Sequence, residues 1–214
     1  MFQYGEEMIS NLSILDYGLG NIFSIKNAAE QQGFNVNIVN TAEEVLASDR
    51  LILPGVGAYQ DAMLRLKRDG LDEAICEFVS SGKPLLGICL GMQLLFEESE
   101  EHGSFQGLGL IKGKVKKFPE INEYKIPQIQ WNKAQLNRGS KLFSDFDKEH
   151  FFYFLHSYYV VCEEEAIESK SHYCDLNYCS AIEFGNVLGV QFHPEKSGSN
   201  GLKVLNNFSK FGGK

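Results

Sequence analysis

Short apolar runs alternate with amphipathic stretches through the first half of the chain, and this alternation restricts the possible folds more than any other feature. The apolar runs predict buried strands at 12–15, 35–39, 51–53 and 84–88. The amphipathic stretches predict helices at 22–32, 59–67, 71–80 and 90–98. Because strands that are joined through helices pair in parallel, the pattern predicts an α/β fold with a doubly wound, mostly parallel central sheet flanked by helices.

The second half of the chain has a different hydrophobic pattern. Alternating or aromatic runs follow Gly109 and predict strands, partly antiparallel, that include 151–155, 180–184 and 187–192, and a closing helix is predicted at 197–211. The sequence contains no internal repeat, low-complexity tract or linker, so we predict that residues 11–214 form a single domain. Residues 1–10 are polar and precede the first predicted strand, and we expect them to be a loose N-terminal extension.

The charge balance restricts the partners that the chain can bind. It carries 28 acidic and 20 basic residues, a formal net charge of −8. This balance repels nucleic-acid phosphates and anionic lipids, so we expect neither nucleic acid nor a membrane as a partner. The densest basic segment, 112–117, is interpreted as the solvated side of a strand. The acidic runs at 97–101 and 163–165 are likewise interpreted as solvated faces.

Cysteine usage and hydropathy indicate the compartment. The sequence has no apolar run of about 18 residues, the length that a membrane-spanning helix requires. Its five cysteines are scattered and odd in number, and no leader-like segment precedes them, so we expect a reduced protein in the cytoplasm. His172, Cys174 and Cys179 match no zinc-ligand spacing, and we predict no metal.

A possible cofactor motif follows the first predicted strand. The segment 16–21 resembles the start of a dinucleotide fingerprint, but the position that needs the third glycine is Phe23. We therefore predict no cofactor. The loop Pro54-Gly55-Val56-Gly57 follows the third predicted strand, and its glycines would let it approach a ligand closely; it is a candidate oxyanion donor or a plain turn.

The most informative segment is 83–93, in which a buried strand leads into Gly87-Ile88-Cys89-Leu90-Gly91 and then into a helix. A side chain at such a turn projects above the carboxyl edge of the sheet, and the glycines allow close backbone packing beneath it. Cys89 would lie at a helix N-terminus, which favours a thiolate, and the N–H of Leu90 could donate to an oxyanion. The motif by itself leaves open whether Cys89 is a nucleophile or a buried structural cysteine.

A nucleophilic cysteine needs a base, and the segment 189–195 contains His193 followed by Pro194 and Glu195. Pro194 disfavours a helical conformation at His193, so we expect an extended segment in which residues two apart face the same side. Glu195 could then accept a hydrogen bond from the imidazole and orient it. A lone histidine after an apolar strand can also be a packed or surface residue.

Four separated motifs occur together in this chain: Pro54-Gly55-Val56-Gly57, Gly87-Ile88-Cys89-Leu90-Gly91-Met92-Gln93, His156-Ser157-Tyr158 and Gln191-Phe192-His193-Pro194-Glu195. With them the chain resembles the class I, or triad, glutamine amidotransferases. Further matches at 16–21, 93–99, 131–132 and 195–198 resemble the glutaminase subunit of imidazole glycerol phosphate synthase. The likeness runs in order from about residue 12 to 211 and implies a flavodoxin-like fold.

The resemblance implies a reaction and a role for each residue. Cys89 would attack the carboxamide of L-glutamine, with His193 as acid and base and Glu195 orienting it. The N–H of Leu90 and a backbone donor at Gly57 would hold the oxyanion. Gln93 and the backbone of Ser157 and Tyr158 would hold the substrate.

The resemblance also implies a partner. The ammonia would pass to a (β/α)8-barrel synthase subunit in a heterodimer, and glutamine hydrolysis would be slow until that partner binds. Asn21 and Trp131 are the expected contacts with this partner, although Trp131 could equally be a core residue.

The chain departs from the histidine-pathway pattern in one stretch. The family usually has His and Gly at the positions of Gln128 and Gln130, and that stretch faces the synthase. Histidine biosynthesis is therefore the leading prediction, and an amidotransferase that forms acetamidino sugars for bacterial surface polysaccharides is the alternative. Two other classes remain open: a catalytically inactive binding scaffold and a free-standing cysteine hydrolase.

Overall fold

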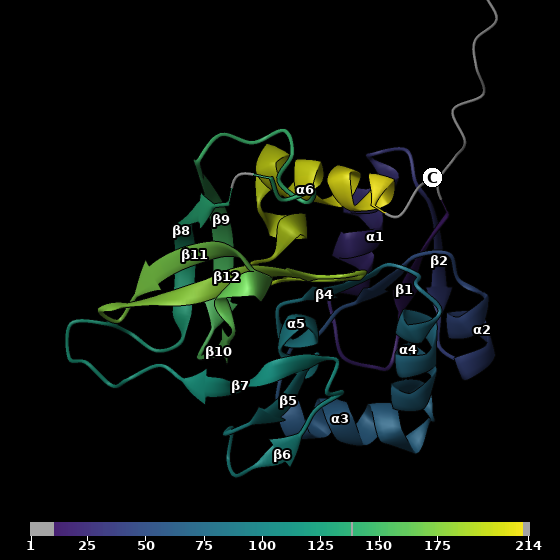
Figure 1. Cartoon of the computed structure of the whole chain (residues 1–214), viewed down its shortest axis with the longest axis horizontal. Helices are drawn as coiled ribbons and strands as arrows, with labels where there is room; N and C mark the ends of the chain where they lie inside the picture. Colours follow the sequence, from purple (N-terminus) through teal and green to yellow (C-terminus); the bar gives the residue numbers. More distant parts are fainter. Residues whose placement is uncertain (1–10, 138, 212–214) are drawn as a thin grey trace, which may run out of the picture.

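The computed structural model describes residues 11–137 and 139–211, so the predicted N-terminal extension at 1–10 lies outside the described residues (Figure 1). Five strands form the parallel part of the sheet in the order β2-β1-β3-β4-β13. Their bounds are β1 Asn11–Leu15, β2 Asn35–Val39, β3 Leu51–Leu53, β4 Leu85–Ile88 and β13 Val187–Val190. The helices of this part are α1 Ile22–Glu30, α2 Ala42–Ala47, α3 Tyr59–Arg68, α4 Leu71–Ser80 and α5 Leu90–Leu94.

Beyond β13 the sheet continues with mainly antiparallel strands, in the order β12-β10-β7-β5-β6. A branch from β12 carries β11, β8 and β9. The strands are β5 Phe96–Ser99, β6 Phe105–Gln106, β7 Ile111–Lys117, β8 Gln128–Leu136, β9 Glu149–His156, β10 Tyr158–Cys162, β11 Ile167–Tyr173 and β12 Leu176–Phe184. The short turns η1 Glu164–Ala166 and η2 Pro194–Lys196 and the last helix, α6 Gly198–Lys210, complete the described chain.

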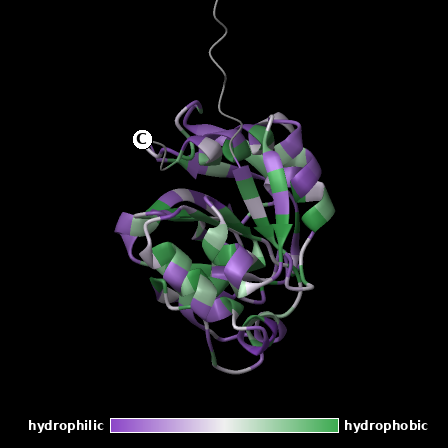
Figure 2. Ribbon diagram, turned by 90° about the vertical axis from the view of Figure 1, so that its right-hand side faces the viewer, coloured by the Kyte–Doolittle hydropathy of each residue, from purple (hydrophilic) through white to green (hydrophobic). Residues whose placement is uncertain are grey.

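Helices cover both faces of the parallel part of the sheet. One apolar cluster joins β1 to α1 and α6, and it includes the stacked rings of Phe152 and Phe192, whose centroids lie 4.0 Å apart. The other cluster lies under α3, α4 and α5. Figure 1 shows α1 and α6 on one side of the sheet and α3 and α4 on the other, and Figure 2 shows hydrophobic and hydrophilic positions alternating on the helices. The predicted α/β fold with flanking helices is confirmed.

The predicted helix at 90–98 is wrong in its second half. The helix α5 ends at Leu94, because the carbonyl of Leu95 accepts hydrogen bonds from the backbone N–H groups of Leu110 and Ile111, at 2.9 and 3.1 Å. The chain then enters β5, where Phe96 pairs with Ile111. Pairing with a strand far along the chain therefore overrides a local pattern that favours a helix.

The short helix α2 was not predicted, although its start carries a recognisable signal. The side chain of Thr41 accepts a hydrogen bond from the N–H of Glu44, and the Glu44 carboxylate accepts from the N–H of Thr41. This reciprocal pair is a capping box, which satisfies donors that a helix N-terminus leaves unpaired. The sequence Thr-x-x-Glu before an apolar pair is the feature that could have identified the helix.

We expect Thr41→Ala to lower the free energy of unfolding by about 1 kcal/mol, because the substitution removes the acceptor for the Glu44 N–H. Urea denaturation of the whole chain measures this change. Thr41→Ser is the matched control, since it keeps the hydroxyl and should keep most of the stability. An equal loss in both variants would show that the cap does not stabilise α2.

Candidate active site

Cys89 lies at a strained turn between β4 and α5. Its backbone has φ 55° and ψ −110°, and it is one of few non-glycine residues with positive φ among the described residues. Its N–H donates to the carbonyl of Val190 at 2.8 Å, and its own carbonyl accepts from the N–H of Gln93 at 3.2 Å. Strained, non-glycine backbone of this kind is concentrated at functional sites. The predicted strand-to-helix placement of Cys89 is confirmed.

The glycine that follows the turn is required by close backbone packing. A Cβ atom at Gly91 would lie 1.9 Å from the carbonyl oxygen of Leu53 in β3, which no side chain can do. A Cβ atom at Gly87 would lie 2.7 Å from the backbone of Gly91 and Met92. The spacing of the two glycines therefore lets α5 start directly against β3 and β4, and this contact aims Cys89 away from the sheet.

His193 follows the carboxyl end of β13, and Glu195 holds its ring. The Nδ1 atom of His193 lies 2.9 Å from Oε1 of Glu195, and the two side chains are only 3% and 0% exposed. The N–H of His193 donates to the carbonyl of Tyr153 at 2.9 Å, and the hydroxyl of Ser197 donates to the His193 carbonyl at 2.7 Å. Glu195 therefore fixes the ring orientation and leaves Nε2 as the atom that can exchange a proton.

The predicted contact between His193 and Glu195 is present, but the expected extended conformation is wrong beyond His193. His193 itself is extended, with φ −99° and ψ 99°, whereas Pro194 opens the 3-10 turn η2. Proline is well tolerated at the first position of a helix, because the N–H that it lacks would have no partner there. The tight turn, and not strand alternation, brings Glu195 under the imidazole.

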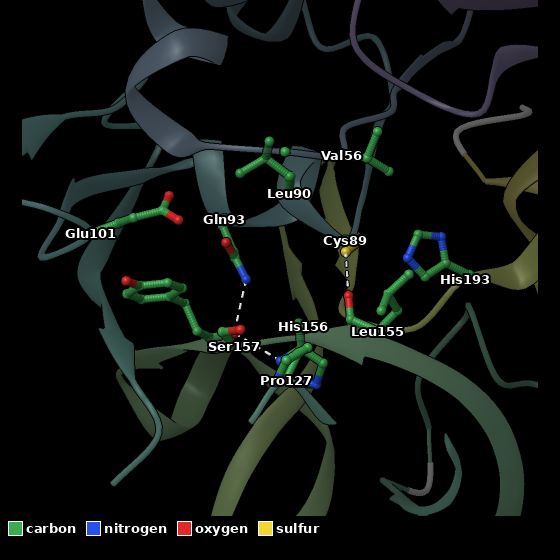
Figure 3. Close-up of a pocket in the computed structure, with 12 residues that line it drawn as sticks. Val56, Cys89, Leu90, Gln93, Glu101, Pro127, Leu155, His156, Ser157 and His193 are labelled. Atoms are coloured by element: carbon green, nitrogen blue, oxygen red, sulfur yellow. Dashed lines mark hydrogen bonds between the residues drawn. The ribbon is translucent and has the colours of Figure 1, made fainter. Parts of the chain in front are cut away.

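Cys89 and His193 face the same cavity, which has a volume of about 220 Å³ (Figure 3). Every residue that was predicted to act in catalysis, in oxyanion binding or in glutamine binding lines this cavity, with the exception of Glu195 behind His193. The lining residues are Val56, Gly57, Cys89, Leu90, Gln93, Glu101, Pro127, Leu155, His156, Ser157, Tyr158 and His193. The fold therefore brings together six separate stretches of the sequence.

The charges in the cavity couple Cys89 to His193. Burial lowers the pKa of His193, but the negative charge of the Cys89 thiolate, followed by that of Glu195, outweighs burial and raises this pKa to about 10. The Cys89 Sγ atom also lies 3.7 Å from the Nε2 donor of Gln191 and 3.6 Å from the carbonyl of Leu155. The amide can donate to the sulfur, and the carbonyl can accept from the S–H group of the thiol.

The candidate oxyanion loop is anchored by a tyrosine. The Tyr17 hydroxyl donates to the carbonyl of Pro54 at 2.9 Å, and burial raises the pKa of Tyr17, so the hydroxyl stays protonated. Gly57 has φ 103°, a conformation that is open to glycine, and it lines the cavity with Val56. The loop is therefore held at its first residue and conformationally free at its last.

The sequence analysis assigned no role to Glu101, which lines the cavity, or to Gln191, which lies beside Cys89. Glu101 belongs to an acidic run that was interpreted as a solvated face, and for Glu101 that interpretation is wrong, because its Oε2 atom accepts from the Tyr59 N–H at 2.6 Å and the side chain lines the cavity. Gln191 is fully buried and links Gln93 to Cys89. Glu101 carried no local signal, whereas Gln191 stands two residues before His193 in a recognised motif.

The two predicted partner contacts lie outside the cavity. Asn21 is the N-cap residue of α1. Trp131 lies on β8 and is 51% exposed, so its alternative interpretation as a core tryptophan is wrong. Exposed Ile129 and Phe151 accompany it on the same face, because Trp131 pairs with Tyr153 and Ile129 with Leu155 across β8 and β9.

Within residues 11–137 and 139–211, no group of three or more His, Cys, Asp or Glu side chains is arranged to hold a metal ion. No helix in the described part of the chain is long and apolar enough to cross a membrane.

The chain is similar to several known proteins. The family model described as glutamine amidotransferase class-I matches residues 13–210. The imidazole glycerol phosphate synthase subunit HisH of Sulfurimonas denitrificans is 46% identical over 205 residues, which cover 94% of this chain and 98% of that protein. The chloroplastic imidazole glycerol phosphate synthase hisHF of Arabidopsis thaliana is 45% identical over 201 residues, covering 93% of this chain and 34% of that protein.

Solved structures share the fold at lower identity. The structure of PurLQS from Thermotoga maritima has a TM-score of 0.75 and 22% identity, and the match covers 94% of this chain and 98% of that chain. A crystal structure titled glutamine amidotransferase has a TM-score of 0.72 and 18% identity, over 92% of this chain and 96% of that chain.

We expect His193 to titrate near pH 10 and to titrate at a much lower pH in Cys89→Ala. The substitution removes the charge that raises the pKa most, and the opposing effect of burial remains. NMR titration of the histidine ring signals measures both midpoints, with His193→Gln identifying the resonance. The same midpoint in wild type and Cys89→Ala would show that the two side chains are not coupled.

Proposed function

The chain belongs to the class-I glutamine amidotransferase family, and we propose that it is the glutaminase subunit of an imidazole glycerol phosphate synthase in histidine biosynthesis. The observation that carries the chemistry is the cavity in which Cys89, on its strained turn, faces His193, which Glu195 orients. The two relatives named above support the pathway, since they match nearly the whole chain at 46% and 45% identity. The free cysteines fit action in the reducing cytoplasm.

The first half-reaction makes a thioester. The Cys89 thiolate attacks the carboxamide carbon of L-glutamine, a C–S bond forms, and the carbonyl electron pair moves to oxygen. The Leu90 N–H at the start of α5 and a backbone donor at Gly57 hold this oxyanion. The protonated ring of His193 then gives its Nε2 proton to the leaving nitrogen, the C–N bond breaks, and ammonia departs.

The second half-reaction restores the enzyme. His193 is neutral after it has lost its proton, so its Nε2 atom can accept a proton from a water molecule that attacks the thioester. The C–S bond breaks, glutamate leaves, and the thiolate of Cys89 forms again beside a protonated ring. Glu195 holds Nδ1 throughout, which keeps Nε2 directed at the cavity.

The cavity also offers groups that recognise the amino-acid part of glutamine. Glu101 is the carboxylate that lines it, and since one carboxylate oxygen accepts from the Tyr59 N–H, the other is available to the substrate ammonium group. Gln93, Ser157 and Tyr158 also line the cavity, and Figure 3 shows Gln93 between Glu101 and Cys89. Together these groups bind the ammonium end of the substrate glutamine near Glu101 and leave its carboxamide end at Cys89.

The exposed apolar face of β8 and β9 is the surface that we assign to the synthase partner. Ile129, Trp131 and Phe151 are 56%, 51% and 53% exposed there. Contiguous exposed apolar side chains with an aromatic centre are typical of binding surfaces. The same face continues to Leu155, which lines the cavity, so a bound partner would stand directly beside the place where ammonia is released.

The partner is a (β/α)8-barrel synthase in a heterodimer. In the plant relative named hisHF, the region that matches this chain is about a third of the protein, so that protein has ample further sequence joined to this region. Ammonia is mostly protonated in neutral water and then has no nucleophilic electron pair. Transfer inside a complex preserves the reactive form.

Cys89→Ala should reduce glutamine-dependent turnover of the complex by at least about a thousandfold and leave ammonia-dependent turnover within about twofold, because only the glutaminase reaction needs the thiolate. Both rates are measured with the synthase partner, and glutamate formation is measured separately. Cys76→Ala, on the outer helix α4, is the matched control. Loss of both activities in Cys89→Ala would contradict the assigned role.

We expect a barrel-type synthase to stimulate glutamine hydrolysis at least tenfold, which is about 1.4 kcal/mol of barrier. The Gly57 end of the loop can present an N–H or a carbonyl to the oxyanion, and a partner that favours the N–H would raise the rate. Glutamate release is measured for the chain alone, with a histidine-pathway synthase and with a sugar-amidating synthase. Stimulation by only the sugar-amidating enzyme would overturn the pathway, and full activity alone would overturn the gating.

A further inference from the structure

Gln128 and His156 form a buried polar pair on the core side of β8 and β9. The strand register places them directly opposite each other, and neither is accessible beyond 6% of its surface. Aromatic rings surround them, with the His156 ring centroid 5.2 Å from that of Phe118 and 5.3 Å from that of Tyr178. Buried polar atoms in such surroundings are costly unless they are hydrogen-bonded, so each atom of this pair needs a partner.

The hydrogen bonds of His156 define its protonation. Its Nδ1 atom lies 2.8 Å from the carbonyl oxygen of Tyr158, and because a carbonyl only accepts, Nδ1 carries the proton. Burial lowers the pKa of His156 to about 4, assisted by the charge of His193 and opposed by the Tyr158 carbonyl. The ring is therefore neutral at pH 7, and its Nε2 atom is an acceptor. That buried acceptor has no partner among the described residues.

Gln128 has a buried donor without a partner, which complements the unpaired acceptor of His156. Its Oε1 atom accepts from the Tyr178 hydroxyl at 3.0 Å, which directs the amide nitrogen away from Tyr178. This Nε2 donor is also buried and has no partner in the part of the chain that the structure describes. The unpaired donor of Gln128 on β8 therefore lies opposite the unpaired acceptor of His156 on the neighbouring strand β9. The Cβ atoms of directly opposed residues are about 4.5–5.5 Å apart, well within the reach of a glutamine side chain.

We propose that Gln128 is a positioning residue for glutamine hydrolysis: its carboxamide N–H donates to His156 Nε2 through one bridging water molecule and holds the ring that supports Tyr158. This inference rests on the proposed function and deepens it. A histidine at position 128 would also present a side-chain N–H, so it is the conservative replacement. The two residue types therefore satisfy the same chemical requirement.

The support reaches the nucleophile through a short chain of hydrogen bonds. The Tyr158 carbonyl accepts from His156 and also from Gln93 Nε2 at 2.9 Å. Gln93 Nε2 lies 3.0 Å from Gln191 Oε1, and Gln191 Nε2 lies 3.7 Å from the Cys89 sulfur. A loose His156 ring would disturb the Tyr158 carbonyl and the Gln93 amide, which form the wall assigned to substrate. The expected defect is therefore in substrate binding more than in chemistry.

The test combines NMR with kinetics. In protein labelled with nitrogen-15 at histidine, Gln128→Leu should move the His156 Nε2 resonance downfield, since that atom loses its donor, and should raise KM for glutamine about fivefold with kcat within twofold. Kinetics are measured with the synthase partner. Gln128→His should restore both values. The matched control is Gln135→Leu, the same substitution at an exposed position of β8, which should change neither.

An unmoved resonance, or a moved resonance with an unchanged KM, would overturn the positioning role. If Gln128→Leu does not fold, Gln128→Glu provides the same test, because a carboxylate facing Nε2 should raise the pKa of His156 well above about 4. An unchanged His156 titration would then overturn the contact. The resonances are read without turnover, so wild-type protein that never hydrolyses glutamine would refute the proposed function and still leave the Gln128 contact measurable.

Discussion

The left-handed backbone of Cys89 is the constraint on which the rest of the site depends. A non-glycine residue in so sparsely populated a conformation costs on the order of 1–3 kcal/mol, and the surrounding structure has to supply it. Contacts with the central strands offset this cost: the Cys89 N–H donates to the carbonyl of Val190 in β13, and Gly91 packs against the Leu53 carbonyl in β3. Cys89 can therefore take up its position only when β3, β4 and β13 are assembled.

The electrostatics of the site follow from this placement. His193 and Glu195 are both almost completely buried, and a buried ion pair is stable only when its remaining polar atoms are satisfied or put to use. The third charged group is the Cys89 thiolate on the other side of the ring, and it contributes more than Glu195 does to the raised pKa of His193. In the proposed reaction, the interactions that keep the His193 ring protonated also prepare it to give a proton to the departing ammonia.

The side of the cavity that we propose binds the substrate depends on a second set of strands. Tyr158 and His156 belong to the antiparallel part of the sheet, whereas Cys89 and His193 follow parallel strands. The cavity therefore lies where the two parts meet, and the outer face of β8 and β9 carries the exposed Trp131 beside it. A partner bound to that face would contact the strands that form this side of the cavity, which gives binding and catalysis a common structural element.

Much of the chemistry could be predicted from the sequence, because the relevant signals are local. A glycine on either side of Cys89 specifies a tight turn, and the spacing of His193 and Glu195 predicted their contact, although the 3-10 turn that makes it was not predicted. The amphipathic periods likewise predicted most helices and the parallel strands within a few residues. In each case adjacent residues dictate the allowed backbone angles, so no knowledge of distant contacts is needed.

Only the tertiary structure decided the features that depend on distant partners. The segment at Phe96 forms a strand because it pairs with Ile111. Glu101 is not simply solvated like the rest of its acidic run, because its carboxylate accepts a hydrogen bond from the Tyr59 N–H. Trp131 is exposed because its face of β8 has no helix over it in the described chain (Figure 1). The sequence by itself determined which groups could react, since that is a property of neighbouring residues. Burial, strand pairing and the meeting of Cys89 with His193 were set by contacts between remote segments, whose energies exceed local preferences.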